Sequence, residues 1–404
     1  MQSKENRLKI IFILNSMTYG IGQILSDISC GLPENINQTI VLLDGKNIYP
    51  HKARVRILGP NCRKPLPVPG LRLLLNVLRF RRILRSVNPD VVLPFHHDSR
   101  VINLLAMRSL PAMHGRTILI DLGLASQFTR YLAGFRKHIY TLLVRLAQKH
   151  ADRIIAIAEG VKSDIVSRYG VDDRKITVIY ASVDSIEINR KAMEPVEHSW
   201  FSEEIPIIAL SGRLMPEKNH ADLLKAFAVV RKQKRCRLVF VGDGIERDAL
   251  TRLAQDLGVA EDVLFAGFQS NPHKFVARSS VFAFPSLFEA QGLVLVEAMA
   301  VGCPIVAYDC PVGPREMLAP GTRKSKEMND IEEAAYGLLV PPGNVEVFAQ
   351  AIMRLLEDPM LRDRYARAGK ERAANFNVQE MVEKYKTILL LPPDMQGSAA
   401  GNGC

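Results

Sequence analysis

The sequence predicts an α/β protein made of two doubly wound domains, each with a parallel sheet covered by helices on both faces. Short apolar runs such as "LKIIFIL" and "PIIALSG" alternate with helical patterns along the chain. Runs that are apolar throughout are typical of parallel strands buried on both faces. The alternation starts afresh near Ile205, after the strand-poor stretch "NRKAMEPVEHSWFSEE". These observations indicate two Rossmann-like domains facing a central cleft, where the carboxyl ends of parallel strands bind ligands.

The pattern also predicts the limits of the domains. We expect an N-terminal domain over residues 1–190, a C-terminal domain over 200–375, and a helix over 376–391 that crosses back to the first domain. The tail 392–404 has the composition of a disordered segment. The expected strands are "LKIIFIL", "QTIVLL", "DVVLPF", "RTILID" and "RIIAIA", followed by "PIIALSG", "RLVFVG", "DVLFAG", "VFAFP" and "PIVAY".

Composition narrows the class of protein. The 404 residues are 48% hydrophobic and 24% charged, which is a normal globular balance. The apolar run Ile10–Leu14 is too short for a signal peptide, and no run reaches the roughly 18–20 residues that span a bilayer. The six cysteines are scattered without a CxxC pair, so neither a zinc site nor a disulfide framework is indicated. A reducing cytoplasm is the expected compartment.

The positive charge is concentrated in the first half of the chain. Residues 1–190 contain 28 Lys and Arg against 14 Asp and Glu, whereas the remainder contains 25 against 28. Such a half is expected to face an anionic membrane, a phosphorylated lipid or a nucleic acid. The segment "LRLLLNVLRFRRILR" reads as an interfacial helix, or alternatively as a surface helix with a solvated basic face. Its leucine stripe is accompanied by Arg72, Arg79, Arg82 and Arg85.

Two segments of the second half could form an anion site. In "LSGRLMPEKNHADLLKAFA", Arg213 and Lys218 lie between the end of a strand and a helix that opens near Asn219. Helix N-termini add positive potential at such a place, although a solvated loop with incidental charges has the same pattern. In "VFVGDGIERDAL", Gly242 permits a tight turn before the next helix.

The stretch "FPSLFEAQGLVLVEAMAVGCPIVA" holds two carboxylates in an otherwise apolar setting. A buried, unpaired carboxylate is costly. We expect Glu289 in a loop and Glu297 in the second turn of a helix from about Leu293 to Val301. Both side chains could then reach one cleft, while Ala290 and Gly292 allow backbone N–H groups to approach a ligand. The alternative is a capping Glu plus a core Glu paired with an arginine.

These motifs, together with "GFQSNP" and "GLLVPPGN", resemble glycosyltransferase family 4 (group 1), whose members are retaining enzymes of the GT-B fold. The resemblance extends from Leu8 to Leu390. It implies a hexosyltransferase-type enzyme that moves a sugar from a nucleotide sugar, UDP-linked by our first expectation, to a lipid-linked saccharide or a growing surface glycan. Polysaccharide biosynthesis is therefore the expected setting.

The resemblance also implies roles for individual residues. Arg213 and Lys218 would bind the donor diphosphate, Glu289 would face the donor sugar, and Glu297 would hold the ribose hydroxyls. The first three are the implied catalytic residues. Further donor contacts are implied at Gly242, Gly267, Phe268, Asn271, Ala290, Gln291, Gly292, Leu293 and Val294.

On the acceptor side, Gly20 and Gly22 lie where the family has a glycine-rich turn after the first strand. Asp121 stands where members commonly carry a histidine, and one of His96 and His97, adjacent on a strand in "PFHHDSR" near the cleft edge, could have a positional role. The chain has no DxD motif of the kind that metal-using transferases carry. Fixed cations and a helix N-terminus can stabilise a leaving diphosphate instead, so we expect no metal and no cofactor besides the nucleotide-sugar co-substrate.

Two other readings of the residues stay open. One is another enzyme on the same scaffold, such as a nucleotide-sugar epimerase or a glycan phosphorylase, although no lysine context suggests a pyridoxal phosphate anchor. The other is a non-catalytic basic protein that binds membranes or nucleic acid. Our interpretation is a cytoplasmic enzyme, peripheral on the inner face of the cell membrane, with no nucleic-acid partner.

Overall fold

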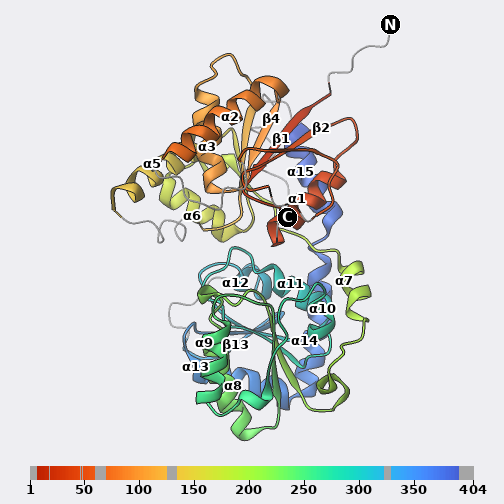
Figure 1. Cartoon of the computed structure of the whole chain (residues 1–404). Coiled ribbons are helices and arrows are strands. Elements are labelled where there is room, and N and C mark those ends of the chain that lie inside the picture. The colour runs from red at the N-terminus through yellow and green to blue at the C-terminus, as the bar shows by residue number, and fades with distance from the viewer. Residues whose placement is uncertain are drawn as a thin grey trace. The chain divides into compact units, whose positions relative to one another are not determined.

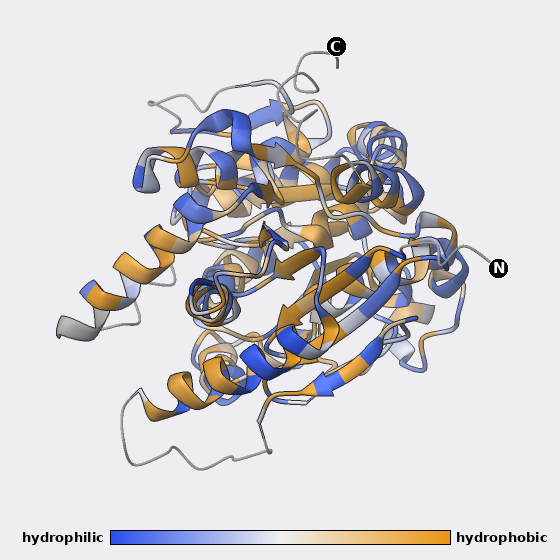
Figure 2. Cartoon of the chain, turned by 90° about the horizontal axis from the view of Figure 1, so that it is seen from above, coloured by the Kyte–Doolittle hydropathy of each residue, from blue (hydrophilic) through white to orange (hydrophobic). Residues whose placement is uncertain are grey.

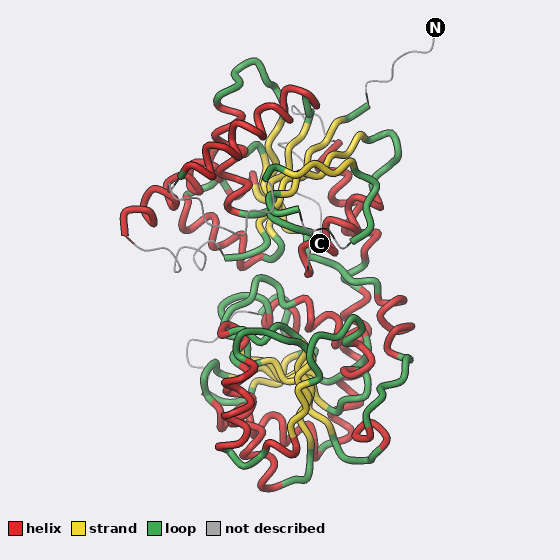
Figure 3. The backbone as a smooth tube through the Cα atoms, in the orientation of Figure 1, coloured by secondary structure: helices red, strands yellow, loops and turns green. Residues whose placement is uncertain are grey.

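The structure is a computed structural model that describes residues 7–17, 19–45, 47, 49–59, 70–124, 134–322 and 329–390. It divides into two compact units, of which unit 1 comprises Met1–Tyr180 with Val378–Cys404 and unit 2 comprises Ala181–Asn377. In each unit a sheet lies between layers of helices (Figures 1 and 3). The expected fold class of two parallel-sheet α/β domains is confirmed. The tail 392–404 lies outside the described residues.

Unit 1 is built on a seven-stranded sheet of order β3-β2-β1-β4-β5-β6-β7, in which every pairing is parallel. The strands are β1 (Lys9–Leu14), β2 (Asn37–Leu42), β3 (Arg54–Ile57), β4 (Val91–Pro94), β5 (Arg116–Asp121), β6 (Arg153–Ala156) and β7 (Ile176–Val178). The helices are α1 (Tyr19–Gly31), α2 (Leu71–Val87), α3 (His97–Arg108), α5 (Gly134–His150), α6 (Glu159–Tyr169) and α15 (Val378–Leu390). The pattern of apolar runs missed β3 and β7.

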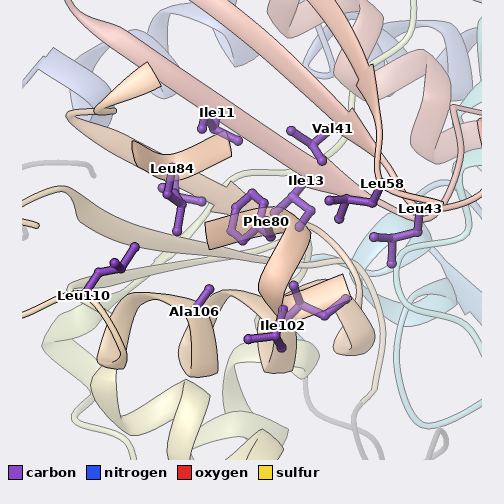
Figure 4. Close-up of a cluster of buried hydrophobic side chains, with 12 residues drawn as sticks. Ile11, Ile13, Val41, Leu43, Leu58, Phe80, Leu84, Ile102, Ala106 and Leu110 are labelled. Carbon is purple, nitrogen blue, oxygen red and sulfur yellow. The ribbon is translucent and has the colours of Figure 1, made fainter. Parts of the chain in front are cut away.

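The core of unit 1 explains why α2 forms where it does. Phe80 and Leu84 point from α2 into a buried cluster with Ile11 and Ile13 of β1 (Figure 4), and Val77 belongs to the same cluster. Their spacing of three and four residues places them on one helix face. In Figure 2 most strands are coloured as apolar, a few are hydrophilic, and the helices carry both polar and apolar residues.

Unit 2 repeats the architecture with the order β10-β9-β8-β11-β12-β14-β13, in which only the β13–β14 pairing is antiparallel among the described strands. The strands are β8 (Ile207–Ser211), β9 (Arg237–Val241), β10 (Val263–Phe265), β11 (Val281–Phe284), β12 (Ile305–Tyr308), β13 (Glu332–Ala334) and β14 (Gly337–Val340). The helices are α7 (Ser185–Ala192), α8 (His220–Gln233), α9 (Arg247–Asp256), α10 (His273–Val276), α11 (Leu293–Ala300), α12 (Pro314–Leu318), α13 (Val345–Glu357) and α14 (Pro359–Ala374).

The boundaries of the units differ in detail from the expected domains. Unit 2 begins at Ala181, ahead of the linker expected between residues 190 and 200, because α7 packs against α10 and α11. Helix α15 belongs to unit 1, where it contacts α1 and where the Leu389 carbonyl accepts a hydrogen bond from Arg116 at 2.8 Å. Among the helices of the described ranges, none combines the length and the apolar character needed to cross a bilayer.

Candidate active site

The carboxyl edge of the unit 2 sheet gathers three loops that touch through glycine. The N–H of Gly212, after β8, donates to the Val241 carbonyl at 3.0 Å, and the N–H of Gly242 donates to the Gly267 carbonyl at 2.9 Å. A Cβ atom on Gly242 would lie 1.9 Å from the Gly212 carbonyl oxygen. Any side chain there would therefore force the loops apart, which is why glycine is required at this position.

Both cations that were expected to bind the diphosphate lie on the loop between β8 and α8. Arg213 is half exposed, and its guanidinium lies 3.6 Å from Oε1 of Glu217. The Nζ atom of Lys218 lies 2.5 Å from Oε1 of Glu289 and 5.8 Å from the ring centre of Phe284. Lys218 is thus held at the sheet edge by Glu289, whereas Arg213 stays accessible to an anion.

Glu289 lies in the loop between β11 and α11, as expected, but it is not free. Its ion pair with Lys218 joins this loop to the loop after β8, and the N–H of Leu287 adds a second link by donating to the Glu217 carbonyl at 2.9 Å. The expectation that both glutamates are available to accept hydrogen bonds from ligand hydroxyls is therefore corrected for Glu289, which is paired with Lys218. A carboxylate this close to an ammonium group is drawn to it by charge, an attraction that the sequence spacing of 71 residues conceals.

Glu297 lies in the second turn of α11, as expected, and no side chain of the described residues hydrogen-bonds to its carboxyl group. It is partly buried among apolar residues of the helix. This burial raises the pKa of Glu297 to about 7, because a low-dielectric setting disfavours the charged form. A strongly shifted acid at a sheet edge is a functional candidate on physical grounds.

The N-terminus of α11 offers backbone donors beside these carboxylates. Gly292 is the N-cap of α11, and its φ of 82° is a left-handed conformation that glycine adopts easily. Because glycine has no side chain, it cannot cap the N–H groups of the first turn. The N–H of Leu295 donates to the Gly292 carbonyl at 2.8 Å. Leu293 and Val294, the first two residues of the helix, are partly exposed. Uncapped N–H groups and the helix dipole favour a bound anion here.

The remaining donor-side residues divide into two kinds. Phe268 is 74% exposed and follows Gly267, whose φ is 67°, so an aromatic face stands free beside the glycine loops. Asn271 instead uses its side-chain amide to bond the Lys191 carbonyl and Glu194, both at 2.8 Å. The Gln291 side chain is also turned inward, to Ala181. The side-chain N–H groups of Asn271 and the whole amide of Gln291 are therefore engaged within unit 2, and the Oδ1 atom of Asn271 is buried without a hydrogen-bond partner among the described residues.

The structure adds residues that motif reasoning did not single out. A Cβ atom on Gly313, whose φ is 99°, would lie 2.8 Å from the Gln291 carbonyl oxygen and 3.0 Å from the Cβ atom of Glu289. Arg315 then bonds Asp309 at 2.9 Å and Glu332 at 2.7 Å, which fixes the loop after β12. The glycine and proline of "PVGPREML" were the available signal for this contact.

In unit 1, Asp121 ends β5 with 1% of its surface exposed. Its Oδ2 atom accepts from Arg100 at 2.9 Å and from Gln148 at 2.8 Å. Burial is the largest single influence and would raise the pKa of Asp121, but Arg100, His97 and the hydrogen bond from Gln148 together outweigh it, so the pKa is lowered. Asp121 is thus a charged partner in a buried network, an arrangement that suits structure better than proton transfer.

The histidines and glycines expected on the acceptor side are also placed differently. His96 and His97 are not on a strand, because His96 is the N-cap of α3 and His97 its first residue. Burial is the main reason that the pKa of each is lowered to about 4. Gly20 and Gly22 lie within the first turns of α1 instead of in a separate turn, and Gly22 packs where a Cβ would lie 2.5 Å from the Tyr49 ring.

The basic face of α2 contains three of its four expected arginines. Arg72, Arg82 and Arg85 are exposed, as are Leu74 and Leu78 at 55% and 43%. Arg79 is the exception, because it is half-buried and donates to the Leu58 carbonyl, just after β3, at 2.9 Å.

The described parts of the chain hold no cluster of three or more His, Cys, Asp or Glu side chains suited to a metal ion.

Comparison with known proteins identifies the class that this fold and site define. Residues 197–372 match the model for glycosyl transferases group 1, and residues 19–186 match that for glycosyltransferase family 4. Together the two matches take in most of both units. The chain therefore belongs to the GT-B glycosyltransferases of these families, as its motifs indicated.

Among curated relatives, the chain is 28% identical to N-acetylgalactosamine-N,N'-diacetylbacillosaminyl-diphospho-undecaprenol 4-alpha-N-acetylgalactosaminyltransferase of Campylobacter jejuni, over 91% of this chain and 95% of the relative. It is 25% identical to lipopolysaccharide 1,6-galactosyltransferase of Salmonella typhimurium, over 71% of each. The crystal structure of Anabaena HepE in complex with UDP has a similar fold, with a TM-score of 0.74, 20% identity and coverage of 95% of this chain and 99% of that one.

Proposed function

We propose that this glycosyltransferase transfers a hexosyl group from a UDP-linked donor to a lipid-linked saccharide, with retention of the anomeric configuration. The observation that carries the proposal is the ion pair of Lys218 with Glu289, which joins the loop that carries Arg213 to the loop that leads into α11, the helix that carries Glu297. The UDP complex of the HepE structure and the diphospho-undecaprenol in the Campylobacter relative's name support the choice of donor and acceptor.

The residues divide the chemistry of transfer as follows. Departure of the diphosphate places growing negative charge beside Arg213, Lys218 and the α11 N-terminus, and preorganised positive groups lower the barrier for such a step. We propose that these groups act without a divalent metal. Glu297 would accept hydrogen bonds from the ribose hydroxyls. Glu289 would position the donor sugar while its ion pair with Lys218 adjusts to the incoming phosphate.

An anionic membrane is the proposed location of the acceptor. The exposed Leu74 and Leu78 lie on the same helix as Arg72, Arg82 and Arg85, a combination that favours an anionic interface. Helix α5, which packs beside α3 as α2 does, adds exposed Ile139 and Leu142. We therefore propose peripheral association with the cytoplasmic face of the membrane through unit 1, in the service of surface-glycan synthesis.

The experiment that tests the proposal is a panel of nucleotide sugars. A UDP-sugar should raise the melting temperature of the protein, because a ligand that binds only the folded state stabilises it by mass action. With a diphosphate-linked lipid saccharide present, UDP should be released and the product should keep the anomeric configuration by NMR. Conversion of the UDP-sugar into its epimer, with the UDP still attached, would favour an epimerase, and lack of any nucleotide binding would refute the proposal.

A further inference from the structure

The side chain of Gln291 connects the β11–α11 loop to the point where the chain enters unit 2. Its Oε1 atom accepts from the Ala181 N–H at 2.8 Å, and its Nε2 atom donates to the Ala181 carbonyl at 2.9 Å. Gln291 is 2% exposed, so these bonds are shielded from water. Ala181 is the first residue of unit 2. One side chain thus satisfies both backbone groups of this residue.

The point where the chain leaves unit 2 lies next to the same segment. The N–H of Val183 donates to the Phe376 carbonyl at 3.1 Å, and Val183 forms a parallel bridge with Asn377, the last residue of unit 2. The two chain passages are therefore hydrogen-bonded to each other. Through Gln291 they are joined to the loop that carries Glu289.

The chemistry of this contact is particular to an amide of this length. An acceptor and a donor on one planar group match the N–H and carbonyl of one backbone residue, as a neighbouring strand does. An ionised Glu could accept from the N–H but not donate to the carbonyl, Met could do neither, and Asn is one methylene shorter. The other side of the loop is held by Gly313, which approaches the Gln291 carbonyl.

We infer that Gln291 is a positioning residue that transmits donor occupancy from the β11–α11 loop to the chain passage at Ala181. This rests on the proposed function, since it takes a uridine diphosphate as the ligand of that loop. When UDP binds at the α11 N-terminus and orders residues 289–294, the two amide bonds order Ala181 as well. Turnover then depends on Gln291 although its side chain faces away from the ligand.

Hydrogen exchange with UDP tests the inference. We compare residues 179–184 with and without UDP in the wild type, in Gln291→Met, and in Gln255→Met, a matched control because Gln255 is exposed on α9. UDP should slow exchange of this segment in the wild type and the control but not in Gln291→Met. The calorimetric affinity for UDP should stay within about threefold in all three proteins, while turnover of Gln291→Met falls about tenfold or more.

Each other outcome has a definite meaning. If wild-type protein does not bind UDP, the proposed function fails and not the coupling. If UDP binds but leaves exchange of residues 179–184 unchanged, or slows it equally in Gln291→Met, the coupling through Gln291 is overturned. Should Gln291→Met fail to fold by circular dichroism, Gln291→Asn replaces it with the same expectation, because the shorter amide keeps polarity but cannot span both bonds.

Discussion

The Nζ atom of Lys218 lies 2.5 Å from Oε1 of Glu289, so a cation proposed for the diphosphate and a carboxylate proposed for the sugar form one ion pair. The two residues come from loops after different strands, β8 and β11. A phosphate that binds Lys218 must either share the ammonium group with Glu289 or displace the Glu289 carboxylate from it. Donor binding and positioning of the sugar are therefore linked through this pair, and their separate contributions can be measured.

The first prediction concerns Glu289. Replacing it with Gln removes the charge that competes for Lys218, so affinity for UDP should be unchanged or slightly higher. Turnover should fall strongly, because the sugar loses a group that positions it in the transition state. Calorimetry with UDP and steady-state kinetics with the UDP-sugar measure the two effects. A loss of UDP affinity as large as the loss of turnover would contradict this role for Glu289.

The second prediction concerns Glu297, whose pKa of about 7 leaves it half protonated near neutral pH. Ribose hydroxyls donate to the ionised form and should lower its pKa in the complex. The complex then binds fewer protons than the free protein. Affinity for UDP should therefore increase as the pH is raised toward about 7, by at most about tenfold per pH unit, and level off above it.

Glu297→Gln should weaken UDP binding by about 10- to 150-fold, the cost of losing a charged hydrogen-bond partner. In this variant the pH dependence of UDP affinity that comes from Glu297 should also disappear, so that only the titration of the UDP phosphate remains. Calorimetry of both proteins between about pH 5.5 and 8 separates the two contributions. Parallel pH profiles for wild type and variant would show that Glu297 does not meet the nucleotide.

A third prediction addresses the basic face of α2. Changing Arg72, Arg82 and Arg85 to Glu should lower the affinity for anionic liposomes by roughly 100-fold, because each basic residue at such a surface contributes about 1 kcal/mol of binding free energy. Co-sedimentation with liposomes at increasing lipid concentration measures this affinity. The matched control changes the exposed Lys232, Arg252 and Arg367 of unit 2 to Glu, with the same change in net charge. Equal binding of both triple variants would identify the α2 face as merely solvated.

A fourth prediction distinguishes structure from catalysis at Asp121. Asp121→Asn leaves the Arg100 guanidinium buried without its countercharge, which should cost about 3–5 kcal/mol of stability. Exchange of β5 and α3 amides measures this loss locally, and Asp173→Asn on the surface of unit 1 serves as the control. A variant with intact protection but no turnover would instead assign Asp121 to proton transfer.

A fifth prediction concerns metal ions. If Arg213, Lys218 and the α11 N-terminus stabilise the leaving diphosphate, turnover in excess EDTA should stay near the untreated value. Arg213→Ala, in contrast, should lower turnover more than it weakens UDP binding, since the negative charge grows in the transition state. Activity lost in EDTA and restored by magnesium or manganese would refute metal independence.

The amino-acid sequence by itself determined the alternation of strands and helices, and it placed the four charged residues on the loops after β8 and β11 and on the helix α11. Continuous apolar runs mark buried parallel strands, and parallel strands bring all their carboxyl ends to one edge, so Arg213, Lys218, Glu289 and Glu297 could be assigned to a common site. The exposed edge strand β3, with the sequence "RVRI", has no such apolar run and was missed.

Only the tertiary structure decided which of these groups are paired. Lys218 and Glu289 are 71 residues apart, and Gln291 and Ala181 are 110 residues apart, so no local pattern records either contact. Arg79 and Arg82 are equivalent in the sequence of α2, yet one reaches the Leu58 carbonyl and the other faces solvent. Partners are set by the packing of distant elements, because charge and hydrogen-bond energy depend on separation in space and on exclusion of water, neither of which follows from sequence spacing.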